Sequence, residues 1–381
     1  MTHDTITIRR GGGNRRIAVR RFTAAAVFTL CATLTAVHPA ASAAPPEPPD
    51  TGSIDSGSAA SNFVTGFGTT LVRPGLAPAG TNDWSCLPSA THPRPVVLVH
   101  GTWENSFDNF AALAPALAEE GFCVFAPDYG RVGPLDGGGV LSILPNTQGL
   151  GPIEQSAHEI GGFVDRVLAA TGAAQVDMVG HSQGGLAARQ YLAFAGGADP
   201  VDPSRNKVAN LVTMGATNHG TTLLGAGVVA RAIDGLVDLD PALGSVAGRA
   251  PIQQMIGSDL LDRLDAAGDT VPGVAYTVIA TRYDEITTPY ASTFLTAGPG
   301  ASVRNVTLQD GCVDDLSDHA SLTYSPRAID WVKHAFDPVG TPEAAIRCEP
   351  HAAVLGGSDH ADAGSAGSAG PVDAIADLSG S

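Results

Sequence analysis

The sequence VDMVGHSQGGLAARQYLAF, residues 176–194, decides the fold. It begins with an apolar run at Val176–Val179 that is typical of a buried strand, and it ends with helix-forming residues at Leu186–Phe194. Between them lies a short turn, Gly180-His181-Ser182-Gln183-Gly184. Glycines on both sides of a serine indicate that the backbone passes very close to other segments there. Ser182 is therefore predicted to occupy a strained strand-to-helix turn that presents its hydroxyl at the end of a sheet.

Six short apolar runs, the one at Val176 among them, have the length and the β-branched content of strands that are buried on both faces. They cover residues 95–100, 123–127, 176–180, 208–214, 274–280 and 303–308. Between the second and third runs, apolar residues repeat at helical spacing from Ile153 until Gly172 stops the pattern. This alternation predicts an α/β fold with a mostly parallel, doubly wound sheet and helices on both faces.

A serine hydroxyl becomes a nucleophile only with a base beside it and an acid that orients the base. For a serine on such a turn, the acid and then the histidine follow along the chain. Asp284 comes just after the fifth apolar run, where an open sheet gathers its site, and the adjacent Glu285 is the alternative acid. His319, in the loop after the sixth run, is the predicted base. The other histidines after the acid are His334, in a predicted helix near residues 326–336, and His351 and His360, near the C-terminus.

An anionic intermediate at Ser182 also needs hydrogen-bond donors, which form an oxyanion hole. The backbone N–H of Gln183 is one donor by position. The second is predicted in VVLVHGTWEN, residues 96–105, where the backbone N–H of Thr102 follows a strand end and its hydroxyl offers a third donor. Three histidines are interpreted as loop-shaping residues without a chemical role: His100, His181 and His219.

Four cysteines lie outside the N-terminal region, at positions 86, 123, 312 and 348. Three pairings are possible, and the short separations favour Cys86–Cys123 and Cys312–Cys348. A zinc site is the competing interpretation, but none of these cysteines shows C-x-x-C spacing.

The N-terminal 43 residues have the layout of a secretory signal peptide: six arginines up to Arg21, an apolar stretch at residues 22–37, and Ala41-Ser42-Ala43. The apolar stretch is too short for a spanning helix, which disfavours the alternative of a retained membrane anchor. Both the general and the twin-arginine export routes stay open, because Arg20-Arg21-Phe22 fits the latter weakly. We expect a secreted protein with no stable membrane insertion.

Composition sets the limits of the working domain. Residues 44–62 form a predicted flexible lead-in and residues 349–381 a predicted disordered acidic tail, which leaves residues 63–348 as one catalytic domain. Without residues 1–43 the chain keeps 15 basic and 37 acidic residues, a net charge of −22. Such a surface repels nucleic acid, which is excluded as a partner.

Together the motifs resemble the secreted actinobacterial lipases of the class 2 type, within the α/β-hydrolase superfamily, over roughly residues 74–338. The motifs are VVLVHGTWEN (96–105), GFCVFAPDYG (121–130), VDMVGHSQGG (176–185), TNHGTT (217–222), YTVIATRYDEITTPY (276–290) and DHASLTYSP (318–326). The SQGG turn and the DEITTP loop are also similar to the fungal lipase B type, whose oxyanion threonine corresponds to Thr102. The acidic tail after Cys348 is not part of the shared pattern.

The resemblance implies a hydrolase of carboxylic esters, above all acylglycerols, with Ser182 as nucleophile, Asp284 as acid and His319 as base. We expect a monomer. Its substrate is a lipid or other small ester, including one at a lipid–water interface, and no cofactor or metal is implied. The alternatives are an acyltransferase or polyester depolymerase on the same residues, and an inactive lipid-binding protein. Residues 221–256 are either a lid over the acyl pocket or ordinary packing helices, and Trp103 either lines the pocket or belongs to the core.

Overall fold

The computed structural model describes residues 60–222 and 240–354. The predicted signal peptide and nearly all of the predicted lead-in therefore lie outside the described residues. The same holds for residues 355–381, most of the predicted tail, and for residues 223–239 within the predicted lid.

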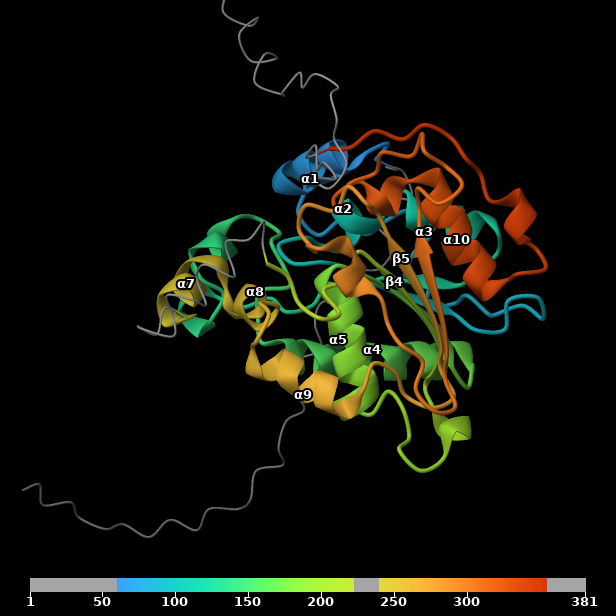
Figure 1. Ribbon diagram of the computed structural model, residues 1–381, viewed down its shortest axis with the longest axis horizontal. Helices are drawn as coiled ribbons and strands as arrows, with labels where there is room; N and C mark the ends of the chain where they lie inside the picture. The colour runs from blue at the N-terminus through green and yellow to red at the C-terminus, as the bar shows by residue number, and fades with distance from the viewer. Residues whose placement is uncertain (1–59, 223–239, 355–381) are drawn as a thin grey trace, which may run out of the picture. The chain divides into compact units, whose positions relative to one another are not determined.

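Six strands form one sheet in the order β2-β1-β3-β4-β5-β6, and every neighbouring pair is parallel (Figure 1). The strands are β1 (Val96–Val99), β2 (Val124–Phe125), β3 (Val176–His181), β4 (Val208–Met214), β5 (Ala275–Ala280) and β6 (Ser302–Thr307). Each strand lies at one of the six predicted apolar runs. The predicted α/β fold with a parallel sheet is confirmed.

Helices cover both faces of this sheet, as a doubly wound fold requires (Figure 1). On one face, apolar residues of α4 (Ile153–Thr171), α5 (Gln183–Phe194) and α9 (Asp259–Ala267) pack on the strands. On the other face lie α2 (Ser106–Phe110), α3 (Leu113–Glu119) and α10 (Pro326–Phe336). Alternate residues of one strand pack on opposite faces of the sheet. Val97 belongs to the hydrophobic cluster under α4, α5 and α9, and Leu98 belongs to the cluster under α2, α3 and α10. This explains why the strands read as continuous apolar runs.

Helix ends follow local chemistry. Ser325 caps α10 by accepting a hydrogen bond from the Ala328 N–H at 3.1 Å, and proline occupies the first helical position, so the predicted bounds are met. Gly172 ends α4 with a left-handed φ of 68°, as its position predicted. Helix α5 begins at Gln183, three residues before the predicted start, because the turn leads directly into helical backbone.

Three further α-helices lie in the described part of the chain: α1 (Phe63–Val72), α7 (Asp240–Ala247) and α8 (Arg249–Gln253). The segment that holds α7 and α8 is the described part of the predicted lid. It returns to the body of the fold where Thr221 pairs with Met255. Trp103 lies beside it, partly exposed, and its indole N–H donates to the Ala247 carbonyl at 3.0 Å. Trp103 thus fastens this segment to the loop that follows β1.

Two disulfides link Cys86 to Cys123 and Cys312 to Cys348, the pairs that the sequence predicted. Disulfides persist in oxidising compartments, so the chain matures outside a reducing cytosol. No helix among the described residues is long and apolar enough to cross a membrane.

Removing the first disulfide should weaken the fold measurably. Its two cysteines are 37 residues apart, and opening a loop of that length lowers the free energy of unfolding by about 3–4 kcal/mol. We expect the Cys86→Ala/Cys123→Ala double variant to unfold at a clearly lower urea concentration than the wild type. An unchanged midpoint would show that the bond does not constrain the unfolded chain.

Candidate active site

The backbone at Ser182 carries a conformation that few non-glycine residues adopt, with φ 53° and ψ −125°. Ser182 stands between the end of β3 and the start of α5, and its N–H donates to the Met214 carbonyl at the end of β4 at 2.9 Å. A Cβ at Gly184 would overlap the Val99 carbonyl oxygen, and one at Gly180 would lie 2.5 Å from the Gly185 nitrogen. Only glycines at these two positions allow the turn to close.

The predicted acid and base lie together at the carboxyl edge of the sheet. Asp284 follows β5, His319 follows β6, and both are buried. His319 Nδ1 is 2.9 and 3.0 Å from the two carboxylate oxygens of Asp284. Asp284 Oδ1 also accepts hydrogen bonds from the N–H groups of Ile286 and Thr287, at 3.0 and 2.7 Å. These bonds hold the carboxylate in line with the imidazole.

The alternative acid, Glu285, occupies a different position. Its carboxylate accepts a hydrogen bond from the backbone N–H of His319 at 3.3 Å. Glu285 therefore binds the backbone of the His319 loop, whereas Asp284 binds the imidazole ring. Burial raises the pKa of Glu285 to about 7.

Two opposing effects act on the base. Burial lowers the pKa of His319, but the charge and hydrogen bond of Asp284, together with the charges of Glu285 and Glu104, outweigh burial and raise the pKa to about 9. The imidazole therefore carries its proton at neutral pH and gives it up in mildly alkaline solution.

Room for this pair comes from Gly215, at the end of β4, which the sequence did not single out. A Cβ there would lie 3.0 Å from Asp284 Oδ2 and 3.3 Å from His319 Nδ1. Within the described residues, no hydrogen bond joins Ser182 to His319, although both occupy the same edge. Such contacts are commonly long before substrate binds.

The loop after β1 approaches the serine from the other side. A Cβ at Gly101 would lie 3.1 Å from the Ser182 Cβ, so the backbone of this loop is at close range. The Thr102 hydroxyl donates to Gln183 Oε1 at 2.5 Å, which ties together the two residues whose N–H groups were predicted to form the oxyanion hole. In the described part of the chain, neither of those N–H groups is used in another hydrogen bond.

Gln254, just after α8, supports this pair and was missed by sequence reasoning. Its amide donates to the Thr102 hydroxyl at 2.8 Å, and its carbonyl oxygen accepts from Thr217 at 2.9 Å. Residues 102 and 254 are far apart in the chain, and no local pattern marks their contact.

A second buried acid–histidine pair, Glu104 and His181, lies next to Ser182. Glu104 Oε2 accepts hydrogen bonds from the Gly101 N–H at 3.0 Å and lies 3.2 Å from His181 Nδ1. His181 Nε2 is 3.0 Å from the His319 carbonyl oxygen. Burial raises the pKa of Glu104, but His181, His319 and His100 together outweigh burial and lower it, which favours the charged carboxylate. His181 thus joins the Thr102 loop to the His319 loop, and the importance of Glu104 was not predicted.

Four other histidines that the sequence analysis considered contact backbone or side-chain groups of nearby loops. His100 Nδ1 is 2.9 Å from the Gly101 carbonyl, and its ring stacks on Tyr129 with a 4.3 Å centroid separation. His219 contacts the Ser292 carbonyl at 2.8 Å and Asp269 at 2.9 Å. His334 lies on α10, where Nδ1 contacts the Thr341 carbonyl at 2.8 Å, and His351 is described below.

Comparison with known proteins agrees with this architecture. The family described as alpha/beta hydrolase fold matches residues 94–252. Triacylglycerol lipases from Pseudarthrobacter phenanthrenivorans and Burkholderia plantarii are each 30% identical to this chain over 132 residues, which is 33% of this chain. The matched region covers 34% and 30% of those proteins, so the chain spans about a third of the length of these relatives.

Among solved structures, lipase B from Aspergillus fumigatus is similar with a TM-score of 0.50 and 18% sequence identity. The match covers 72% of this chain and 60% of that protein. At this level of identity the likeness concerns the fold alone. The chain has the α/β-hydrolase fold.

The interaction between Asp284 and His319 should be detectable in solution through the pKa of the His319 ring. An NMR titration of the His319 ring should show a pKa of about 9, and Asp284→Asn should lower it clearly, because the largest contribution that opposes burial is then removed and only the charges of Glu285 and Glu104 remain. A His319 pKa that is the same in both proteins would contradict the pairing.

Proposed function

We propose that this chain is a secreted serine hydrolase that cleaves carboxylic esters, with triacylglycerols and related acylglycerols as its substrate class. Ser182 acts as nucleophile, His319 as base and Asp284 as the acid that orients it. The observation that carries the proposal is the placement of a buried His319–Asp284 pair at the same sheet edge as a serine on a strained turn. Unused N–H donors beside that serine support it.

The reaction follows from the positions of these groups. Ser182 Oγ attacks the ester carbonyl carbon while its proton passes to His319 Nε2, and Asp284 stabilises the resulting imidazolium at Nδ1. The N–H groups of Thr102 and Gln183 receive the carbonyl oxygen as it becomes an anion. The tetrahedral intermediate collapses, His319 returns the proton to the leaving alcohol, and the acyl group stays on Ser182.

Water then completes the cycle. His319 takes a proton from the water molecule as its oxygen attacks the acyl carbon. A second tetrahedral intermediate forms and collapses, the proton returns to Ser182, and the carboxylic acid leaves. The Thr102 hydroxyl donates to Gln183 in this structure, so it would have to rotate to serve as a third donor.

The acyl-pocket wall is proposed to include the described residues 240–256, where Gln254 contacts the Thr102 hydroxyl. Export through the signal peptide at residues 1–43 agrees with the two disulfides. The detailed assignment to the class 2 lipases of actinobacteria rests on the sequence motifs.

Activity on p-nitrophenyl esters from acetyl to palmitoyl tests the proposal. The wild type should cleave them, and Ser182→Ala should lose turnover by a factor on the order of 10⁶, because the acyl acceptor is gone. The acyl length that is cleaved fastest separates an esterase from a lipase. Equal rates for both proteins would refute the nucleophile assignment.

The pH profile provides a second test. Only the deprotonated imidazole can accept the Ser182 proton, so kcat/KM should rise about tenfold per pH unit and level off near the His319 pKa of about 9. Asp284→Asn should lower both the plateau and the inflection. A profile that is already flat from pH 6 upward would exclude a base with this pKa.

A further inference from the structure

The loop that carries His319 is bound by a segment that follows Cys348. Ser317 Oγ lies 2.9 Å from His351 Nδ1, and the Val354 N–H donates to Asp318 Oδ2 at 2.7 Å. The His351 carbonyl accepts a hydrogen bond from the Leu316 N–H at 2.8 Å. These contacts reach the three residues that precede the base. The first residues of the predicted tail, 349–354, are thus ordered against this loop.

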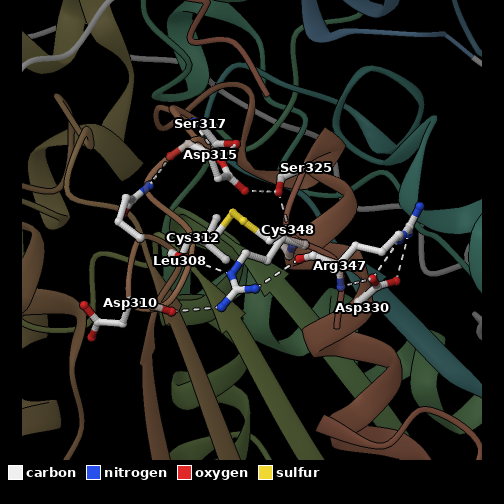
Figure 2. Close-up of a disulfide and its surroundings, with 12 residues drawn as sticks. Leu308, Asp310, Cys312, Asp315, Ser317, Ser325, Asp330, Arg347 and Cys348 are labelled. Atoms are coloured by element: carbon white, nitrogen blue, oxygen red, sulfur yellow. Dashed lines mark hydrogen bonds and ion pairs between the residues drawn. A yellow bond between two sulfur atoms is a disulfide. The ribbon is translucent and has the colours of Figure 1, made fainter. Parts of the chain in front are cut away.

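The segment is fastened at its start. Cys348 is joined to Cys312 by the second disulfide, and the Arg347 side chain donates to both oxygens of Asp330 on α10, at 2.7 and 2.8 Å (Figure 2). Arg327 donates to the Arg347 carbonyl at 3.0 Å. Residues 348–354 are called the strap, and its origin is fixed to α10 and to the start of the His319 loop.

The contact between the strap and Ser317 has a definite donor and acceptor. The Ser317 hydroxyl has one proton, and it donates this proton to Asp315 Oδ1. Ser317 Oγ can therefore only accept from His351, so Nδ1 of His351 carries a proton. Burial lowers the pKa of His351, and a neutral ring with its proton on Nδ1 satisfies the contact.

The same loop is also held by contacts within itself, with Ser325 and with the residue that follows β5. Asp315 is fully buried and accepts from the Ser317 N–H at 2.9 Å and from Ser325 Oγ at 2.7 Å. The Thr281 hydroxyl, just after β5, donates to the Ser317 carbonyl. The loop is thus bound both by Thr281, just after β5, and by the strap.

We propose that the strap positions the His319 ring toward Asp284 and Ser182, and that His351 acts in this as a positioning residue through Ser317. This inference rests on the proposed function, since it takes His319 to be the base. Loss of the His351 contact frees the residues next to His319, which lets the ring turn away from Asp284. A displacement of a reacting group by about 1 Å can cost about a hundredfold in rate.

The test compares three full-length variants in the ester assay. His351→Ala should lower kcat by about tenfold or more, with KM unchanged, and should shift the alkaline inflection of kcat/KM to lower pH, because His319 loses part of its bond to Asp284. His351→Asn should restore both, since its amide places an N–H donor near the Nδ1 position. His334→Ala removes a partly buried histidine of α10 that contacts Thr341, Arg304 and Trp331 and none of the site residues, so this variant should behave like the wild type.

Unchanged kinetics in His351→Ala would overturn the proposal. So would a loss of activity that His351→Asn does not restore and that leaves the inflection in place, because such a loss reflects general destabilisation. Thermal unfolding of each variant shows directly whether stability has changed.

An NMR titration of His319 separates this inference from the proposed function. A wild type without esterase activity would refute the proposed function alone. If His351→Ala then still lowered the pKa of His319, the strap would be shown to position the ring. If the pKa did not move, the positioning role would fail whatever the activity.

Discussion

The structure depends on one close approach of backbone segments, at the turn around Ser182. A non-glycine residue with φ near +53° costs on the order of 1–3 kcal/mol, and such a conformation persists only where its surroundings enforce it. Here Gly184 lies against the Val99 carbonyl, and the Ser182 N–H is bound to the carbonyl of Met214. The turn therefore fixes the ends of β1, β3 and β4 at one point. The loops that leave these strands must meet beside the serine.

Burial of charge at this edge follows from the same geometry. An ionised group that loses water must gain partners, or its burial costs several kcal/mol. Asp284 accepts hydrogen bonds from two backbone N–H groups and Glu104 from one, and each carboxylate faces a histidine. The two pairs are connected, because His181 binds the carbonyl of His319. A shift of one loop would leave a buried charge without a partner, so the polar network penalises movement of the site.

The sheet and the order of the site residues could be predicted because each has a local signal. Strands buried on both faces appear in the sequence as apolar runs. The start of α10 is marked by the capping residue Ser325 and the proline that follows it. The roles of Gln254 and Gly215 had no such signal, since each depends on a contact between residues far apart in the chain. Composition was misleading near the C-terminus. His351 lies in a segment without aromatic residues, yet it is ordered by the Cys312–Cys348 bond and by backbone pairing.

These long-range contacts share one physical task. The strands hold Ser182 and the oxyanion donors directly, since those groups lie at or next to strand and helix ends. His319 has no such support, because it stands in a loop twelve residues past the end of β6. A loop loses conformational entropy when it is fixed, at about 1–2 kcal/mol per residue, and its own few contacts offset that loss poorly. Hydrogen bonds to Thr281, just after β5, and to His351 supply the missing contacts, so the segment after Cys348 completes a site that the sheet begins.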